Sequence, residues 1–375
     1  MKRLHPQAQP SHELPLSVSP PFHLFCIASS HANAQESPPA REPIKGLRVK
    51  EDIMKKGFSK QATSAGLACA LLLALASLLA ASARTDDDVE GAPQFSDWSE
   101  PVNLGPVVNW PDKSDQQPAI SKDGLSLYFA SGRLGGFGDF DIYVSQRASV
   151  NDPWGTPQNL GPAINTSFRE FGPALSTDGH SLYFASDRPG SLGKLDLYVS
   201  RRHNKRDDFG WQPPENLGSG VNTNATENGA NYFEDETNGT ITLYFQSDRL
   251  GGNDIYAATL QADGTFGTAV LVPELSSSFD DSGPAIRRDG LEIFLGSNRP
   301  GSLAGSSDLW VSRRANTLDP WLPPVHLEVV NSAATENRPA LSFNGTELYF
   351  TSTRRGGPDP QDLYVATRTK LKNPD

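Results

Sequence analysis

The chain has 375 residues, including 33 glycines and 30 prolines, and 37% of it is hydrophobic. This density of turn-forming residues excludes a mainly helical protein and is typical of many short strands joined by tight turns. The net charge of −11 argues against nucleic acid as a partner, because an acidic surface repels phosphate.

The first predicted element is a secretory signal peptide at residues 54–83. Two lysines follow Met54, residues 65–80 are apolar, and the segment ends in Ala81-Ser82-Ala83. The apolar run has 16 residues, fewer than the ~20 that span a bilayer, so we expect cleavage and no stable membrane insertion afterwards. We therefore predict a periplasmic or secreted bacterial protein.

Residues 1–53 have no strand or helix pattern. We predict that they are disordered and belong to an upstream extension, with Met54 as the true start. Cys26 and Cys69 both precede the predicted cleavage site, so the mature chain has no disulfide. Nine basic and five acidic residues lie in the same part, which leaves 24 against 39 and a net charge near −15.

A linker is predicted at residues 84–93, and five copies of one repeat follow in residues 94–370, before a short tail at 371–375. The copies are 55 to 57 residues apart and begin at Trp98, Trp154, Trp211, Phe266 and Trp321. Short apolar runs separated by Asp-Gly or Asn-Gly predict four antiparallel strands in each copy, which is the size of a propeller blade. The sequence therefore predicts an all-β protein, a five-bladed β-propeller of four-stranded antiparallel blades.

The phase of the repeat predicts how the ring closes. The first copy starts with the segment around Trp98, and the last copy stops after Tyr364. If each such Trp segment is the outermost strand of the preceding blade, the last blade lacks its outer strand. We predict that the N-terminal strand fills this place and hides an open sheet edge.

The second copy carries the clearest motif, Pro173-Ala174-Leu175-Ser176 followed by Asp178-Gly179 and Leu182-Tyr183-Phe184. With the Asp-Leu-Tyr that follows, this pattern resembles the WD40-like repeat PD40, which is found in the TolB propeller and in many bacterial envelope proteins. The resemblance extends over residues 94–370. It implies a propeller in the cell envelope and no particular activity, since propellers host many unrelated functions.

Two sets of charged residues recur in every copy. A carboxylate stands three residues before the Pro or Ala of each predicted inner strand, and we interpret it as structural or as a holder of a cation or polar ligand at the axis. These carboxylates are Asp115, Glu170, Glu227, Asp281 and Glu336. The second set predicts arginine–aspartate pairs across one hairpin, joining Arg133, Arg188, Arg249, Arg299 and Arg354 to Asp141, Asp196, Asp254, Asp308 and Asp362.

Function is expected where the copies differ. Aromatic side chains stand on three loops before the inner strands, and larger polar residues stand beside some carboxylates. Together they could form a face for a sugar or a peptide. In the alternative interpretation, the aromatic side chains pack between blades. The ligand-binding candidates are thus the five carboxylates together with Trp110, Gln117, Phe168, Arg169, Phe279 and Arg338. The three histidines of the mature part are scattered, so no catalytic residues can be named from the sequence, and we predict no metal or cofactor.

The preferred interpretation is a monomeric binding module that holds a glycan, a peptide or an envelope protein on its loop face. The alternative is a glycoside hydrolase that uses carboxylates at the mouth of the central channel. Two carboxylates in a deep pocket would favour the alternative, whereas five equivalent hydrogen-bonded carboxylates would weigh against it.

Overall fold

The computed structural model describes residues 93–303, 306–355 and 361–371. The predicted upstream extension, the signal peptide and nearly all of the linker and tail lie outside the described residues. The described part forms five four-stranded antiparallel sheets. It contains no helix long and apolar enough to cross a membrane.

Four sheets each take consecutive strands, and the fifth takes three C-terminal strands and the first strand. The strands of the first two blades are β2 (Asp115–Ile120), β3 (Ser126–Ser131), β4 (Asp141–Gln146) and β5 (Gln158–Asn159), then β6 (Glu170–Leu175), β7 (Ser181–Ser186), β8 (Asp196–Arg201) and β9 (Glu215–Asn216). The third and fourth blades contain β10 (Glu227–Glu234), β11 (Ile241–Ser247), β12 (Asp254–Thr259) and β13 (Val270–Leu271), then β14 (Asp281–Ile286), β15 (Glu292–Ser297), β16 (Asp308–Arg313) and β17 (Val325–His326). The fifth blade contains β18 (Glu336–Leu341), β19 (Glu347–Ser352), β20 (Asp362–Thr367) and β1 (Val102–Asn103).

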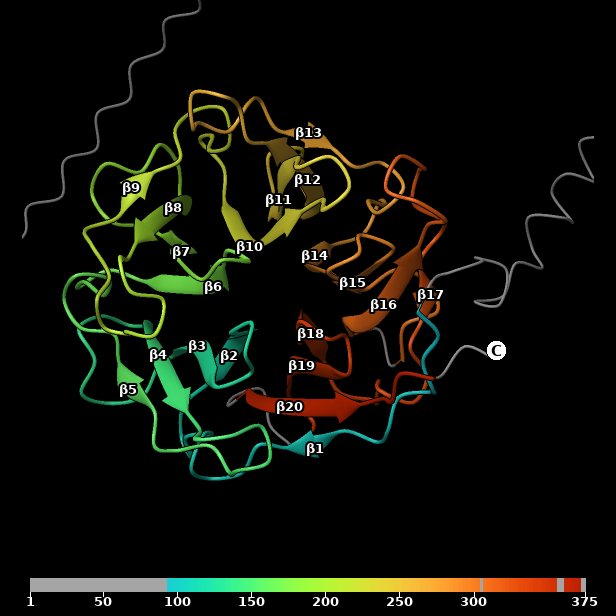
Figure 1. Cartoon of the computed structure of the whole chain (residues 1–375), viewed down its shortest axis with the longest axis horizontal. Helices are drawn as coiled ribbons and strands as arrows, with labels where there is room; N and C mark the ends of the chain where they lie inside the picture. Colours follow the sequence, from blue (N-terminus) through green and yellow to red (C-terminus); the bar gives the residue numbers. More distant parts are fainter. Residues whose placement is uncertain (1–92, 304–305, 356–360, 372–375) are drawn as a thin grey trace, which may run out of the picture. The chain divides into compact units, whose positions relative to one another are not determined.

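The five sheets stand around a common centre (Figure 1), with β2, β6, β10, β14 and β18 innermost. Each inner strand contacts the inner strand of the next blade, and β18 contacts β2, so the ring is closed. The predicted fold is therefore confirmed in blade number and in strands per blade.

The N-terminal strand closes the last blade as predicted. In β1, Val102 pairs with Val365 and Asn103 with Tyr364, both in β20. The Asn103 side-chain amide also donates to the Asp362 carboxylate at 2.9 Å. This pairing covers the outer edge of β20, which would otherwise offer free backbone groups to another chain.

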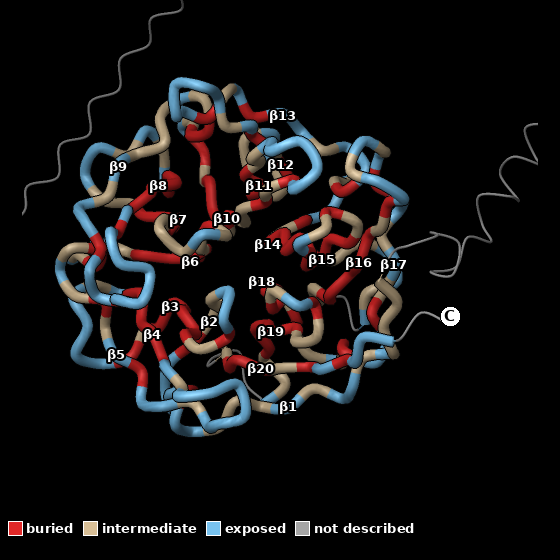
Figure 2. The backbone as a smooth tube through the Cα atoms, viewed as in Figure 1, coloured by how far each residue is buried: buried red, intermediate tan, exposed pale blue. Residues whose placement is uncertain are grey.

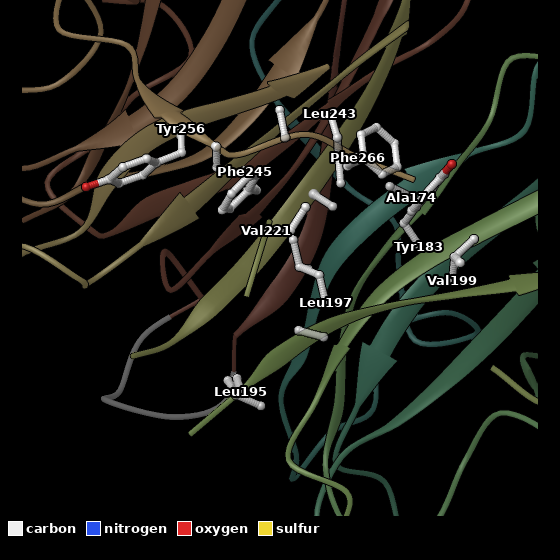
Figure 3. Close-up of a cluster of buried hydrophobic side chains, with 14 of the residues drawn as sticks. Ala174, Tyr183, Leu195, Leu197, Val199, Val221, Leu243, Phe245, Tyr256 and Phe266 are labelled. Carbon is white, nitrogen blue, oxygen red and sulfur yellow. The ribbon is translucent and has the colours of Figure 1, made fainter. Parts of the chain in front are cut away.

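Hydrophobic side chains fill the spaces between neighbouring blades. Figure 2 shows that burial is concentrated along the strands and that the outer loops are exposed. One cluster joins the second and third blades through Tyr183, Leu197, Leu243 and Phe245 (Figure 3). The Leu-Tyr-Phe runs seen in the sequence supply much of this core, because both faces of the second strand pack against a neighbour.

The predicted arginine–aspartate pairs are wrong. Arg133 pairs with the carboxylate of Asp115 at 2.6 Å, and its counterparts Arg188, Arg249, Arg299 and Arg354 pair with the other four carboxylates of that ring. Asp141 accepts hydrogen bonds from the backbone amides of Phe137 and Gly138 instead. The physical reason is register: Asp115 lies opposite Ser131 on the neighbouring strand, so the arginine two residues beyond Ser131 reaches inward to it.

Candidate functional site

A central cavity of about 400 Å³ lies on the propeller axis. Its wall consists of the inner strands from their third residue onward and of the turns that follow these strands. In the described part, the first two residues of each inner strand do not line it. The cavity therefore has its floor at the third residues and its mouth at the turns between inner and second strands.

The cavity floor is formed by the third residues of the five inner strands. All five have a positive φ, between 55° and 61°, where the pairing with the second strand is irregular. Three are Gly172, Gly229 and Gly283, and the other two are Gln117 and Arg338. A side chain in this region costs about 1–3 kcal/mol, so these two residues store backbone strain at the axis.

Arg338 extends across the floor from the fifth blade to the third. A Cβ on Gly283 would lie 3.1 Å from Cδ of Arg338, and one on Gly229 would lie 3.2 Å from its Nη1. The same Nη1 donates to Oε1 of Gln246 in β11. Burial lowers the pKa of Arg338 to about 10, so the side chain stays charged at neutral pH.

Gln117 is the second polar side chain of the floor and is 5% exposed. Its backbone amide donates to Oγ1 of Thr351 in the fifth blade at 3.0 Å. Its side-chain oxygen is buried without a hydrogen-bond partner in the described part. An unpaired buried acceptor costs free energy, which makes it a candidate contact for a ligand hydroxyl.

The mouth of the cavity is built by the turns after the inner strands. Lys122 and Arg288 lie over the ring of Phe343, 4.4 and 4.6 Å from its centroid. Arg288 also forms an ion pair with Glu236 at 2.7 Å, and both side chains are about half exposed. Such exposed pairs contribute little to stability, so the mouth can rearrange around a ligand.

The third copy has an insertion at residues 234–239, which shapes one side of the mouth. It extends β10 to eight residues, two more than the other inner strands. Its turn is held by the Asp235 carboxylate, which accepts from the backbone amide of Thr237 at 2.9 Å and from its hydroxyl at 2.6 Å. Glu234 and Glu236, on either side of Asp235, line the central cavity.

A side cavity of about 340 Å³ adjoins the central one and extends between the second and third blades. Ser176, Asp178 and Tyr232 line both. Tyr232 stacks on Tyr183 with ring centroids 5.8 Å apart. The two cavities therefore share part of their walls, and these walls are polar and aromatic.

The charges of two carboxylates affect the pKa of Tyr232 at this junction. Its pKa is raised well above the usual value, first by burial and then by the charge of Glu234, with Asp178 also contributing. Asp178 accepts from the Ser176 hydroxyl at 2.6 Å and from the His180 backbone amide at 2.9 Å. Although burial acts to raise the pKa of Asp178, these hydrogen bonds lower it overall, so the carboxylate is ionised at neutral pH.

The ring of carboxylates predicted from the sequence has a structural environment. Each is fully buried, pairs with an arginine and accepts a hydrogen bond from a backbone amide of the preceding loop. Burial raises the pKa of Asp115 and Glu170. In the described part, Asp115, Glu170, Glu227, Asp281 and Glu336 do not line either cavity.

The aromatic candidates lie on the loops that lead into the inner strands, at the end opposite the mouth. Trp110, Phe168 and Phe279 are 37 to 41% exposed, so they are not packed between blades. Arg169 pairs with Asp187 at 2.8 Å. Only Gln117 and Arg338 of the predicted residues line the central cavity; ligand contact by the others stays a prediction.

Sequence reasoning missed Asp178, Tyr232 and Glu234. Asp178 stands in an Asp-Gly pair and was interpreted only as a turn residue. The signal that could have revealed Glu234 is the insertion of the third copy, which the sequence places after an inner strand. A repeat pattern does not say at which end of the inner strands the channel is open, and this end decides which turns form the site.

No protein-family model and no curated protein matches the chain. Among solved structures, it is similar to an α-L-arabinofuranosidase from Lactobacillus brevis, with 18% identity, 72% of this chain and 95% of that chain covered, and a TM-score of 0.50. It is also similar to the catalytic domain of an α-L-arabinofuranosidase from Coprinopsis cinerea (14% identity, 74% and 98% covered, TM-score 0.49). A putative TolB from Agrobacterium tumefaciens shows 18% identity, 74% and 86% covered, and a TM-score of 0.43.

These comparisons correct the preferred interpretation of the sequence. At such low identity, the likeness to the Lactobacillus brevis enzyme shows the shared fold alone. Because that fold occurs in an α-L-arabinofuranosidase, the lack of a familiar catalytic motif in a regular propeller does not indicate a binding module. The alternative, a glycoside hydrolase, does not hold with the carboxylates first assigned to it, because all five are equivalent, buried and hydrogen-bonded.

Proposed function

We propose that the chain is a glycoside hydrolase whose oligosaccharide substrate lies in the central cavity and continues into the side cavity. Asp178 and Glu234 are the reacting carboxylates in this proposal. The observation that carries it is that Asp178 and Glu234 both line the central cavity, together with Tyr232, and that Asp178 and Tyr232 also line the side cavity. Hydrolysis of a glycosidic bond generally requires two such carboxyl groups, one on each side of the bond.

The two carboxylates have different surroundings, which suits different roles. Asp178 is ionised at neutral pH because two hydrogen bonds stabilise its charge, so it can act as nucleophile or general base. Glu234 ends β10 and is partly buried, and it is left as the proton donor to the leaving oxygen. The phenol of Tyr232, which lines both cavities, can hydrogen-bond a substrate hydroxyl.

The walls of the joined cavities also suit a sugar chain. Sugar rings stack on aromatic faces, and Tyr183, Tyr232 and Phe266 line the side cavity. Two adjoining cavities of about 400 and 340 Å³ give room for more than one sugar unit. With the predicted signal peptide, this supports an enzyme of the cell envelope or the medium, built from PD40-type repeats.

The test is release of reducing ends from a panel of neutral and acidic oligosaccharides by the full chain. Asp178→Asn and Glu234→Gln should each reduce the rate about 10²- to 10⁴-fold, because each removes a proton-transfer or nucleophilic group. Asp123→Asn is the matched control. Asp123 holds the equivalent turn in the first copy, accepting from the Ser121 hydroxyl at 2.7 Å, and it does not line either cavity.

The control variant should keep the rate of the unchanged protein. Full activity in both cavity variants would contradict the assignment of these residues. Lack of hydrolysis across the whole panel, by a folded protein, would contradict the proposed function itself.

A further inference from the structure

We propose that the cavity floor binds the carboxylate of an acidic sugar, with Arg338 as the group that recognises it. This inference rests on the proposed function and narrows its substrates to chains that contain uronic acids. The supporting observations are an unpaired cation, a strained backbone and an unpaired acceptor, all on the floor of the central cavity.

Arg338 is a cation without a counter-ion. Among the described residues, no carboxylate lies within ion-pair distance of it, whereas the recurring arginines of the blades all have one. Burial lowers the pKa of Arg338, as expected for a cation that is held in a site with little water. A charge that is largely removed from water and has no partner is costly unless a ligand supplies the opposite charge.

The guanidinium of Arg338 has more N–H donors than its hydrogen bond to Gln246 uses. Its hydrogen bond to Gln246 uses one N–H, and a guanidinium has five in a planar fork. Its side chain is partly exposed and lines the central cavity. A carboxylate matches this fork with two parallel hydrogen bonds, a geometry that a neutral hydroxyl does not offer.

The backbone at Arg338 gives an independent reason to expect a ligand. The residue has φ = 55°, in the left-handed region. The second, third and fourth copies have glycine at the same place. Glycine would remove the strain, and the neighbours Gly229 and Gly283 leave the space in which the long side chain lies. A strained and uncompensated arginine at the axis is explained by binding and not by stability.

Gln117 is the reason to expect an acidic sugar as the ligand and not a bare anion. Its buried side-chain oxygen lacks a partner, so it can accept a hydrogen bond from a sugar hydroxyl. A floor with one cationic donor and one neutral acceptor fits a group that carries a carboxylate beside hydroxyls. The volume of about 400 Å³ is also far larger than a phosphate ion needs.

The experiment measures binding to the full chain by calorimetry with sodium glucuronate, sodium galacturonate, glucose, galactose and inorganic phosphate. At least one acid should bind ten-fold or more tightly than its neutral counterpart. Arg338→Gly should reduce the affinity for this acid to that for the neutral sugar. Its melting temperature should be equal or higher, because glycine relieves the strained φ.

Two further variants control the result. Arg206→Gly removes an exposed arginine that does not line either cavity and should leave binding of the acid unchanged. Arg338→Lys keeps the charge but loses the fork and should bind the acid with intermediate affinity. A marked loss of melting temperature in Arg338→Gly would mean that the arginine has a structural role and would overturn the inference.

The remaining outcomes separate this inference from the proposed function. Equal binding of acids and neutral sugars overturns the inference, as does phosphate that binds more tightly than either acid. Hydrolysis of neutral oligosaccharides at an unchanged rate by Arg338→Gly overturns it too, while the hydrolase proposal stands. Binding of an acid that depends on Arg338, without hydrolysis of any acidic oligosaccharide, supports the binding site and contradicts the hydrolase.

Discussion

Gln117 and Arg338 occupy a position that is glycine in the other three blades, and both were singled out from the sequence for that reason. The sequence could not show that this position has a positive φ or that Arg338 reaches Gln246 in another blade. These features depend on how five inner strands meet at the axis. A residue that deviates from a regular repeat is therefore a good indicator of a site. The chemistry of that site can be inferred only from the structure of the assembled ring.

The arginines illustrate the opposite case, in which a recurring residue was recognised but its partner was not. Arg133 was predicted to pair with Asp141, since the two stand at the ends of one hairpin. In the structure Asp141 is occupied by turn amides and Arg133 reaches Asp115, which is 18 residues earlier in the chain. Sequence proximity favoured the wrong partner because strand register decides which side chains meet.

Glu292 offers a prediction at this scale. It is 1% exposed and accepts from Arg368 at 2.5 Å, with Arg287 and Arg313 each at 3.1 Å. Burial acts to raise its pKa, but the hydrogen bond and charge of Arg368, together with the other arginines, lower it overall. The stabilisation by Glu292 is therefore present above the ordinary glutamate pKa and is lost as the pH falls toward the lowered one.

We predict that Glu292→Gln lowers the free energy of unfolding by about 3 kcal/mol at pH 7, because it leaves buried arginines uncompensated. The difference from the unchanged protein should shrink below about pH 4.5, the region in which the glutamate of the unfolded chain takes up its proton. Urea denaturation at several pH values measures both quantities. A difference that does not depend on pH would show that the carboxylate is not charged in the folded protein.

At the level of elements, the alternation of turns and apolar runs predicted the strands and their grouping into blades. The third-copy insertion is visible in the sequence as extra residues, but its place in the site is not. Because β10 continues to Glu234, the insertion brings two glutamates to the central cavity. The insertion affects the site because it lengthens β10. An alignment of the copies shows the extra residues but not that they extend this strand.

The N-terminal segment is the element on which ring closure depends, and Trp98 tests its contribution. The Trp98 ring packs against Phe294 at a centroid distance of 5.9 Å and lies 4.3 Å from the guanidinium of Arg368. We predict that Trp98→Ala lowers the free energy of unfolding by about 2 kcal/mol, since a partly buried aromatic side chain is removed.

Trp154→Ala is the matched variant, because Trp154 stands at the same repeat position and packs in the same way on Tyr349 and Arg147. Both variants should lose similar stability in urea denaturation. If Trp98→Ala unfolds like the unchanged protein while Trp154→Ala is destabilised, the N-terminal segment does not contribute to closing the ring.

For the whole molecule, the period of the repeat was sufficient to predict a closed five-bladed ring. It was not sufficient to place the site, since the ring has two faces with different residues. The loops before the inner strands carry Trp110, Phe168 and Phe279, and the turns after these strands form the mouth of the cavity. The central claim is that substrate enters at the second face.

A crystal structure of the Glu234→Gln variant soaked with an acidic oligosaccharide tests this claim most directly. We predict electron density for the sugar in the central and side cavities, beside Asp178, with a carboxylate at the guanidinium of Arg338. Density on the opposite face, against Trp110, Phe168 or Phe279, with an empty central cavity, would contradict the account.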